Sequence, residues 1–162
     1  MKIGVLCVQG AFAEHIAMLK ALDASPFEIR QKADLSDCFD GLILPGGEST
    51  VMGKLLRTLG LFEPLSQMIN AGLPVFGTCA GLLLLAQKIE NDSRVHFQAM
   101  HLTARRNAFG RQLSSFRTTA PVKGVGDFPM VFIRAPIITE VGADCDVLAQ
   151  VNGNIVAARQ GK

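Results

Sequence analysis

The 162-residue sequence contains no tryptophan, no tyrosine and no long hydrophobic run. No apolar stretch approaches the roughly 20 residues of a membrane-spanning helix, so a membrane protein is not expected. Residues 1–9 have no basic stretch ahead of an apolar one, so they do not predict a signal peptide. Sixteen basic and 14 acidic residues give a net charge of +2, which is too small to indicate nucleic-acid binding.

The spacing of the cysteines excludes the common metal and redox motifs. The four cysteines are Cys7, Cys38, Cys79 and Cys145, and no two of them form a C-x-x-C pair. The sequence therefore predicts neither a metal site nor a cofactor. Without a signal peptide, reduced thiols in a cytoplasmic protein are expected.

Short apolar runs alternate with segments of helical periodicity in the first half of the chain. The expected strands cover residues 3–8, 27–30, 41–44 and 74–76, and the expected helical stripes cover 12–19, 52–59, 62–69 and 82–89. This alternation predicts a three-layer α/β sandwich with a mostly parallel central sheet.

The second half has a different pattern, which predicts an antiparallel segment added to the parallel sheet. Its apolar runs cover residues 130–133, 137–140, 147–151 and 155–158. Asn152-Gly153-Asn154 separates the last two runs and is typical of a hairpin turn. Residues 1–162 together are expected to form a single domain.

Cys79 is the strongest candidate for a catalytic residue. It lies in the G-x-C-x-G sequence of residues 77–81, between a predicted strand and a predicted helix. The same arrangement exposes the nucleophile of the G-x-S-x-G elbow. The helix start favours a thiolate, and the N–H of Ala80 can stabilise an oxyanion. The alternative is a structural cysteine buried in a tight turn.

Two more turns are expected at the same edge of the sheet. Residues 45–50 (PGGEST) follow one predicted strand, and Gln9-Gly10 follow another. Ligands of parallel sheets bind at the carboxyl ends of the strands, so both turns are expected near Cys79. The loop glycines can supply a second oxyanion donor, although an ordinary strand-to-helix connection explains them equally well.

The basic residues leave several alternatives open. The arginines that could bind a carboxylate are Arg105, Arg106, Arg111 and Arg134, and each could instead be a solvated surface charge. A cysteine nucleophile usually needs a histidine base, and the candidates are His15, His96 and His101. None of the three has an acidic partner at a fixed local spacing, so the sequence does not select one.

Six segments, in order along nearly the whole chain, carry a family resemblance. They are residues 9–15 (QGAFAEH), 42–50 (LILPGGEST), 76–82 (FGTCAGL), 106–112 (RNAFGRQ), 132–136 (FIRAP) and 155–161 (IVAARQG). Together they resemble the glutaminase subunit of pyridoxal 5′-phosphate synthase. That subunit is a class I glutamine amidotransferase with a flavodoxin-like fold.

The resemblance implies hydrolysis of L-glutamine to glutamate and ammonia. The ammonia passes to a partner synthase, within a complex of twelve plus twelve subunits. Cys79 would be the nucleophile, and the oxyanion donors would come from Gly46, Gly47 and Ala80. The glutamine pocket would be lined by Gly47, Glu48, Ser49, Arg106, Ile133 and Arg134. Gln9 and Gly10 would face the synthase and couple its docking to the oxyanion hole.

The sequence departs from the family in one important respect. The second half contains no His-x-Glu pair. The family's base and its orienting acid lie in a Phe-His-Pro-Glu segment that follows the position corresponding to Lys162. His101 and Arg105 also stand where the family usually has Asp and Glu. A chain of these 162 residues is therefore expected to be weakly active or inactive.

Two alternative functions stay open at this point. One is a non-catalytic module that binds the synthase and regulates it. The other is a glutaminase that serves a different ammonia acceptor, such as a synthase of the imidazole-glycerol-phosphate type. The segments at residues 9–15 and 106–112 argue against the second alternative.

Overall fold

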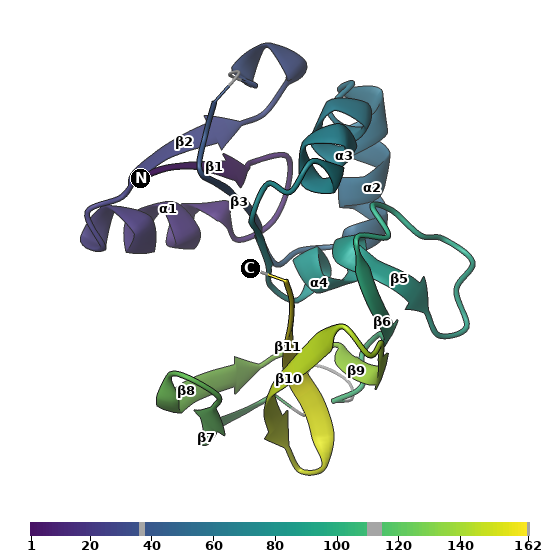
Figure 1. The fold of residues 1–162 in the computed structure, drawn as a ribbon. Coiled ribbons are helices and arrows are strands. Elements are labelled where there is room, and N and C mark those ends of the chain that lie inside the picture. The colour runs from purple at the N-terminus through teal and green to yellow at the C-terminus, as the bar shows by residue number, and fades with distance from the viewer. Residues whose placement is uncertain (36–37, 110–114, 162) are drawn as a thin grey trace. The chain divides into compact units, whose positions relative to one another are not determined.

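The computed structural model describes residues 1–35, 38–109 and 115–161 (Figure 1). The chain forms two compact units, Met1–Leu85 and Ala86–Lys162. None of the helices within the described residues is long and apolar enough to cross a membrane.

The first unit contains a four-stranded parallel sheet in the order β2-β1-β3-β4. Its strands are β1 (Lys2–Leu6), β2 (Ser25–Ile29), β3 (Gly41–Leu44) and β4 (Val75–Gly77). Its helices are α1 (Phe12–Ala21), α2 (Ser49–Thr58), α3 (Phe62–Asn70) and α4 (Ala80–Leu85), with a short 3-10 helix over Lys32–Asp34. The order of the elements confirms the parallel α/β architecture that the sequence predicts.

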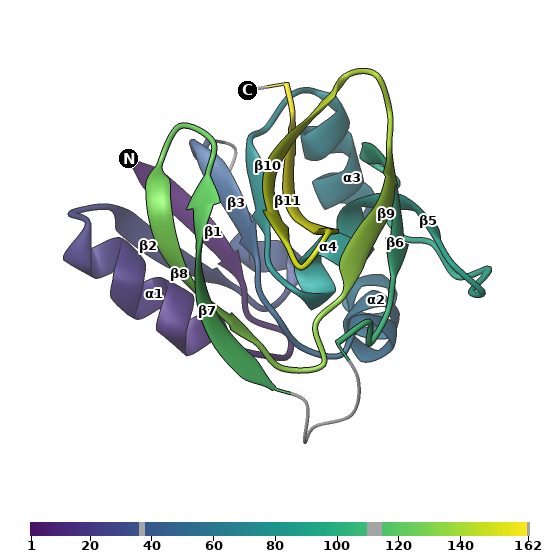
Figure 2. The same cartoon turned by 90° about the horizontal axis from the view of Figure 1, so that it is seen from below.

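The two faces of this sheet are covered by different helices. Ile3, Val5 and Ile43 point to one face and pack against Phe12 and Ile16 of α1. Neighbouring side chains on a strand point to opposite faces. The other face therefore carries the fully or almost fully buried Leu6, Leu42 and Leu44. Figure 2 shows α1 on one side of the sheet and α2 and α3 on the other, which makes three layers.

The second unit contains a mixed five-stranded sheet in the order β10-β11-β9-β6-β5. Its strands are β5 (Ala86–Ile89), β6 (Met100–Arg105), β9 (Ile137–Val141), β10 (Cys145–Val151) and β11 (Asn154–Gln160). Only β5 and β6 pair in parallel among these described strands. The predicted antiparallel segment is therefore confirmed, and the β10–β11 turn has positive φ at Asn152 and Gly153.

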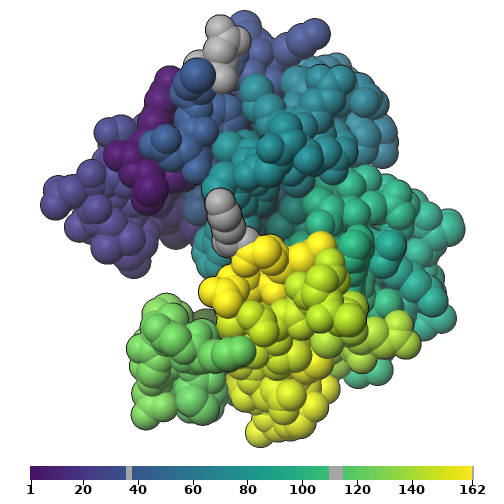
Figure 3. Space-filling view, in the orientation of Figure 1, coloured from purple at the N-terminus to yellow at the C-terminus, as the bar shows by residue number. Residues whose placement is uncertain are grey.

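A separate hairpin completes the second unit. It consists of β7 (Phe116–Val122) and β8 (Gly126–Phe132), paired antiparallel along their whole length. Ala120 and Phe132 of the hairpin pack with Val151 of β10, so the hairpin rests on the β10–β11 pair. The space-filling view shows the green hairpin beside the yellow strands (Figure 3).

One predicted helix is shorter than the sequence indicates. The apolar spacing predicts a helix that carries Leu82, Leu85, Ala86 and Ile89, but α4 ends at Leu85. Ala86 and Ile89 instead lie in β5, where both are buried and pair with residues of β6. The same apolar spacing fits a buried strand, and a partner strand that begins at residue 100 leaves no local signal in the sequence.

Candidate functional site

Cys79 lies at the sharp turn between β4 and α4, as the sequence predicts. Its backbone adopts the left-handed conformation, with φ of 50°, and the residue is exposed. A non-glycine residue in this conformation is strained and persists only where the surrounding structure fixes it. The turn is closed by a hydrogen bond from the Gly81 N–H to the Thr78 carbonyl at 2.8 Å. The Leu82 N–H donates to the Cys79 carbonyl at 3.1 Å.

Close backbone packing requires the two glycines on either side of Cys79. A Cβ on Gly77 would lie 2.7 Å from the carbonyl carbon of Gly81. A Cβ on Gly81 would overlap the carbonyl oxygen of Leu44 in β3. The helix therefore starts in direct contact with the strands, and this contact turns Cys79 outward at the carboxyl edge of the sheet.

The loop after β3 passes beside this turn. A Cβ on Gly46 would lie 3.4 Å from the Cβ of Cys79. The Gly46 carbonyl accepts a hydrogen bond from the Ala11 N–H at 2.9 Å. Because the peptide bond is trans, the N–H of Gly47 points away from Ala11. The N–H of Ala80 belongs to the first turn of α4, where helical N–H groups have no acceptor within the helix.

The turn after β1 is bonded to the same loop. The side-chain oxygen of Gln9 accepts a hydrogen bond from the Glu48 N–H at 2.9 Å. Gly10 has φ of 103°, and a Cβ there would overlap the carbonyl oxygen of Gly46. The structure therefore brings the three predicted turns of the first unit together, at residues 9–11, 46–48 and 77–81.

Glu48 and Ser49 form the start of α2. Glu48 is the N-cap residue, and its carboxylate accepts a hydrogen bond from the Thr50 hydroxyl at 3.1 Å. Ser49 is only 2% exposed. Its hydroxyl has no hydrogen-bond partner within the described part of the chain. A buried hydroxyl of this kind is available to a ligand polar group.

The remaining predicted pocket residues belong to the second unit and are described within it. The segments around Arg106 and Arg134 are joined by a hydrogen bond from the Ala108 N–H to the Ala135 carbonyl at 3.0 Å. Arg134 has φ of 48° and is exposed, and Ile133 is 56% exposed. Arg111 lies outside the described residues.

Arg106 approaches an acidic residue that the sequence analysis does not single out. Its Nη2 lies 3.5 Å from Oδ2 of Asp92. Hydrogen bonds from Arg94 lower the pKa of the Asp92 carboxyl to about 2, and the charge of Arg106 acts in the same direction. Asp92 thus remains a carboxylate at neutral pH and forms an ion pair with Arg106. Arg105 lies 4.0 Å from Glu90 in an exposed ion pair.

The histidines have different surroundings. His15 Nε2 lies 3.1 Å from the hydroxyl of Thr78, the residue that directly precedes Cys79. Burial lowers the pKa of His15, although the charge of Glu14 opposes this shift. His101 Nδ1 lies 2.8 Å from Asp144 in the second unit. The sequence gives no signal for the contact between His15 and Thr78, because 63 residues separate the two.

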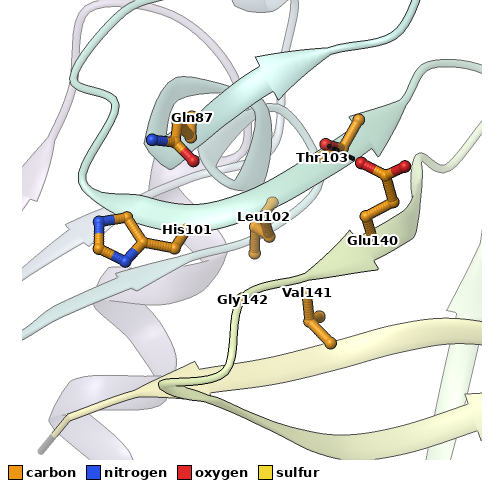
Figure 4. A pocket seen from close by; sticks show the side chains of 7 residues that line it. All are labelled: Gln87, His101, Leu102, Thr103, Glu140, Val141 and Gly142. Atoms are coloured by element: carbon orange, nitrogen blue, oxygen red, sulfur yellow. Dashed lines mark hydrogen bonds between the residues drawn. The ribbon is translucent and has the colours of Figure 1, made fainter.

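The second unit also contains a small open pocket of about 220 Å³. Gln87, His101, Leu102, Thr103, Glu140, Val141 and Gly142 line it (Figure 4). The Thr103 hydroxyl donates to the carboxylate of its cross-strand neighbour Glu140 at 2.9 Å. None of the residues predicted for the glutamine site lines this pocket. No cluster of His, Cys, Asp and Glu among the described residues is suited to a metal ion.

The sequence is similar to one family profile and to several known proteins. The profile of the SNO glutamine amidotransferase family matches residues 5–162. The pyridoxal 5′-phosphate synthase subunit PdxT of Methanocorpusculum labreanum is 59% identical over 160 residues, which are 99% of this chain and 84% of the relative. PdxT of Haemophilus influenzae (strain PittEE) is 53% identical over 163 residues, with coverage of 99% and 85%.

Solved structures agree with the sequence comparisons. A crystal structure of a glutamine amidotransferase matches with a TM-score of 0.92 and 41% identity, and the match covers 99% of this chain and 85% of the other. PurLQS from Thermotoga maritima matches with a TM-score of 0.67 and 15% identity, covering 98% and 81%. The second likeness concerns the fold alone.

Proposed function

Because this chain belongs to the SNO glutamine amidotransferase family, we propose that it hydrolyses L-glutamine to glutamate and ammonia for pyridoxal 5′-phosphate synthesis. The observation that carries this proposal is the exposed, left-handed Cys79 beside the glycine loop at residues 46–47. The relatives at 59% and 53% identity are both pyridoxal 5′-phosphate synthase subunits. A different ammonia acceptor or a purely regulatory module is therefore not favoured.

The proposed reaction starts with attack of the Cys79 thiolate on the side-chain amide carbon of glutamine. The new S–C bond turns the carbonyl oxygen into an oxyanion, which the N–H groups of Ala80 and the Gly46–Gly47 loop would stabilise. The C–N bond then breaks, and the departing nitrogen takes up a proton and leaves as ammonia. Water attacks the resulting thioester and releases glutamate and the thiol.

The proposed substrate contacts are those that the family resemblance implies, and each is described within its own unit. In the first unit, Glu48 and the buried hydroxyl of Ser49 would meet the polar groups of glutamine beside the loop. In the second unit, Arg106 and Arg134 would supply guanidinium groups for a carboxylate, which such groups can bind with two hydrogen bonds. Ile133 would add apolar contact. The guanidinium of Arg106 lies in an ion pair with Asp92.

The partner is a synthase subunit, which accepts the ammonia. We propose that Gln9 and Gly10 face this partner, because they are bonded to the loop that carries the oxyanion donors. The proposed complex has twelve subunits of each kind and lies in the cytoplasm, without a role for nucleic acid or membrane. The free thiols of the described cysteines are compatible with a reducing compartment.

The proposed reaction also needs a general base, which a histidine usually supplies to a cysteine nucleophile. The 162 residues contain three histidines, and none of them lies in a His-x-Glu pair. Loss of a base from such a catalytic unit typically lowers the rate by several orders of magnitude.

The test identifies the nucleophile without measuring the turnover of glutamine. The chain is incubated with a glutamine analogue that carries an electrophilic carbon in place of the amide, and the labelled residue is located by peptide mass spectrometry. We expect labelling of Cys79, competition by L-glutamine and no such competition by L-asparagine. Labelling of Cys38 or Cys145 in place of Cys79, or indifference to glutamine, would contradict the proposal.

A further inference from the structure

His15 contacts the segment that carries the nucleophile, although it lies on a different element. Its side chain is partly buried on α1, and Nε2 lies 3.1 Å from the Thr78 hydroxyl. Its ring meets the ring of Phe76 edge to face, with centroids 6.4 Å apart and an interplanar angle of 85°. One imidazole thus contacts two of the three residues that precede Cys79.

Each polar group of Thr78, namely its N–H, its carbonyl and its hydroxyl, takes part in a hydrogen bond. Its N–H donates to the Leu44 carbonyl at 3.0 Å, and its carbonyl accepts from the Gly81 N–H at 2.8 Å. Its hydroxyl meets His15. The next residue, Cys79, has the strained φ of 50°. A strained conformation persists only where its neighbours are fixed, so each bond to Thr78 contributes to holding the turn.

The start of α1 is bonded to the other half of the site. The Ala11 N–H donates to the Gly46 carbonyl, and Gln9 accepts from the Glu48 N–H. His15 follows Ala11 by four residues, which is about one helical turn, or roughly 6 Å along the axis. A single helix therefore contacts the glycine loop at its start and the Cys79 turn one turn later.

We propose that His15 is a positioning residue that holds the Cys79 turn through the Thr78 hydroxyl. With this contact, α1 fixes the nucleophile and the glycine loop relative to each other. The inference rests on the proposed function in that Cys79 is taken as the nucleophile. His15 itself does not touch the reacting atoms in this role. Burial lowers its pKa, so the neutral ring meets Thr78 at pH 7.

Four single variants separate the hydrogen bond from the ring packing. His15→Phe keeps a ring against Phe76 and removes the hydrogen bond, whereas His15→Gln keeps a polar group and removes the ring. Thr78→Val removes the hydroxyl at nearly constant shape, whereas Thr78→Ser retains it. The double variant His15→Phe/Thr78→Val measures whether the two residues act through one contact.

The readout is the rate at which iodoacetamide alkylates Cys79, measured by peptide mass spectrometry with Cys38 as an internal reference. We expect His15→Phe and Thr78→Val each to slow alkylation about fivefold, which corresponds to one hydrogen bond of roughly 1 kcal/mol. The turn would relax away from the conformation that exposes the thiol. The double variant should be no slower than either single variant, and His15→Gln and Thr78→Ser should stay near the parent rate.

Several outcomes would overturn the proposal. One is alkylation of Cys79 in Thr78→Val at the rate of the parent protein. Another is equal slowing of alkylation in His15→Phe and His15→Gln. The third is a double variant whose slowing is the product of the slowing in the two single variants. Met18→Ala, an exposed change on α1, is the matched control and should keep the parent rate. Thermal unfolding checks each variant, and if His15→Phe does not fold, Thr78→Val alone decides. Alkylation needs no glutamine, so the proposed glutaminase function can fail while this contact is confirmed, or the reverse.

Discussion

The side-chain oxygen of Gln9 accepts a hydrogen bond from the backbone N–H of Glu48, which lies 39 residues later in the sequence. Next to it, the Ala11 N–H donates to the Gly46 carbonyl. The two bonds run in opposite directions between the same pair of turns. A force on the turn at residues 9–11 is therefore transmitted directly to the peptide groups beside Cys79.

Removing the Gln9 acceptor should loosen the loop measurably. In Gln9→Ala, we expect the Glu48 amide to exchange its hydrogen about fivefold faster, as the loss of one hydrogen bond of about 1 kcal/mol implies. Gln9→Glu keeps an acceptor oxygen and serves as the control, with exchange close to the parent. Amide exchange followed by NMR measures both. Unchanged exchange in Gln9→Ala would show that the loop is held by other contacts.

The strained backbone of Cys79 predicts an unusual order of stabilities. We expect Cys79→Gly to be more stable than Cys79→Ala by about 1 kcal/mol, because glycine adopts positive φ without steric penalty. Urea unfolding measures the difference, and both variants should lose the labelling by the glutamine analogue. At Ser66, within α3, the order should reverse, because glycine destabilises a helix by about 1 kcal/mol relative to alanine. If the alanine variant were more stable than the glycine variant at both positions, strain at Cys79 would be excluded.

Ser49→Ala should weaken the binding of L-glutamine without lowering the free energy of unfolding. The hydroxyl is buried and has no partner in the part of the chain that the structure describes. Its removal should leave the free energy of unfolding unchanged or raise it by up to about 1 kcal/mol. The protection that L-glutamine gives against labelling of Cys79 should then require a higher glutamine concentration. Ser66→Ala is the control, and equal glutamine protection in both variants would remove Ser49 from the pocket.

Asp92 gives a prediction for the pH dependence of stability. Its pKa is lowered from 3.8 to about 2, first by hydrogen bonds from Arg94. A lowered carboxyl pKa stabilises the folded protein above about pH 4, and this stabilisation is lost as the pH falls towards 2. Asp92→Asn should lower the thermal unfolding midpoint at pH 7, and its difference from the parent should shrink between pH 4 and 2.

The exposed Asp127→Asn is the matched control for this experiment. Its unfolding midpoint should follow that of the parent over the same pH range. A deficit in Asp92→Asn that stays constant down to pH 2 would assign the effect to lost shape or packing and not to the charge of Asp92.

Local signals account for what the sequence predicts well. The strand at residues 41–44 is a short apolar run that ends at Pro45-Gly46-Gly47, and the structure gives the same bounds. The hairpin turn at Asn152-Gly153 has the positive φ values that these two residue types tolerate. The spacing of Gly77, Cys79 and Gly81 predicts an exposed turn, and the close approach of the backbones confirms it.

The features that the sequence does not predict depend on distant partners. Ala86 and Ile89 fit a helical spacing, but their pairing with β6 places them in a strand. The strand β7 contains two threonines and Pro121, which weaken its apolar pattern, and it forms only against β8. The contact of His15 with Thr78 joins residues that are 63 positions apart. Periodicity reports local preference, so none of these long-range contacts has a sequence signature.

The division of the chain at Leu85 has a consequence for its synthesis. The first unit ends at the last residue of α4, and it contains the Cys79 turn, the glycine loop and His15. Domains generally fold as units while the chain is made, starting from the N-terminus. The parts that surround the nucleophile can therefore assemble on the ribosome before translation has delivered Arg106 and Arg134.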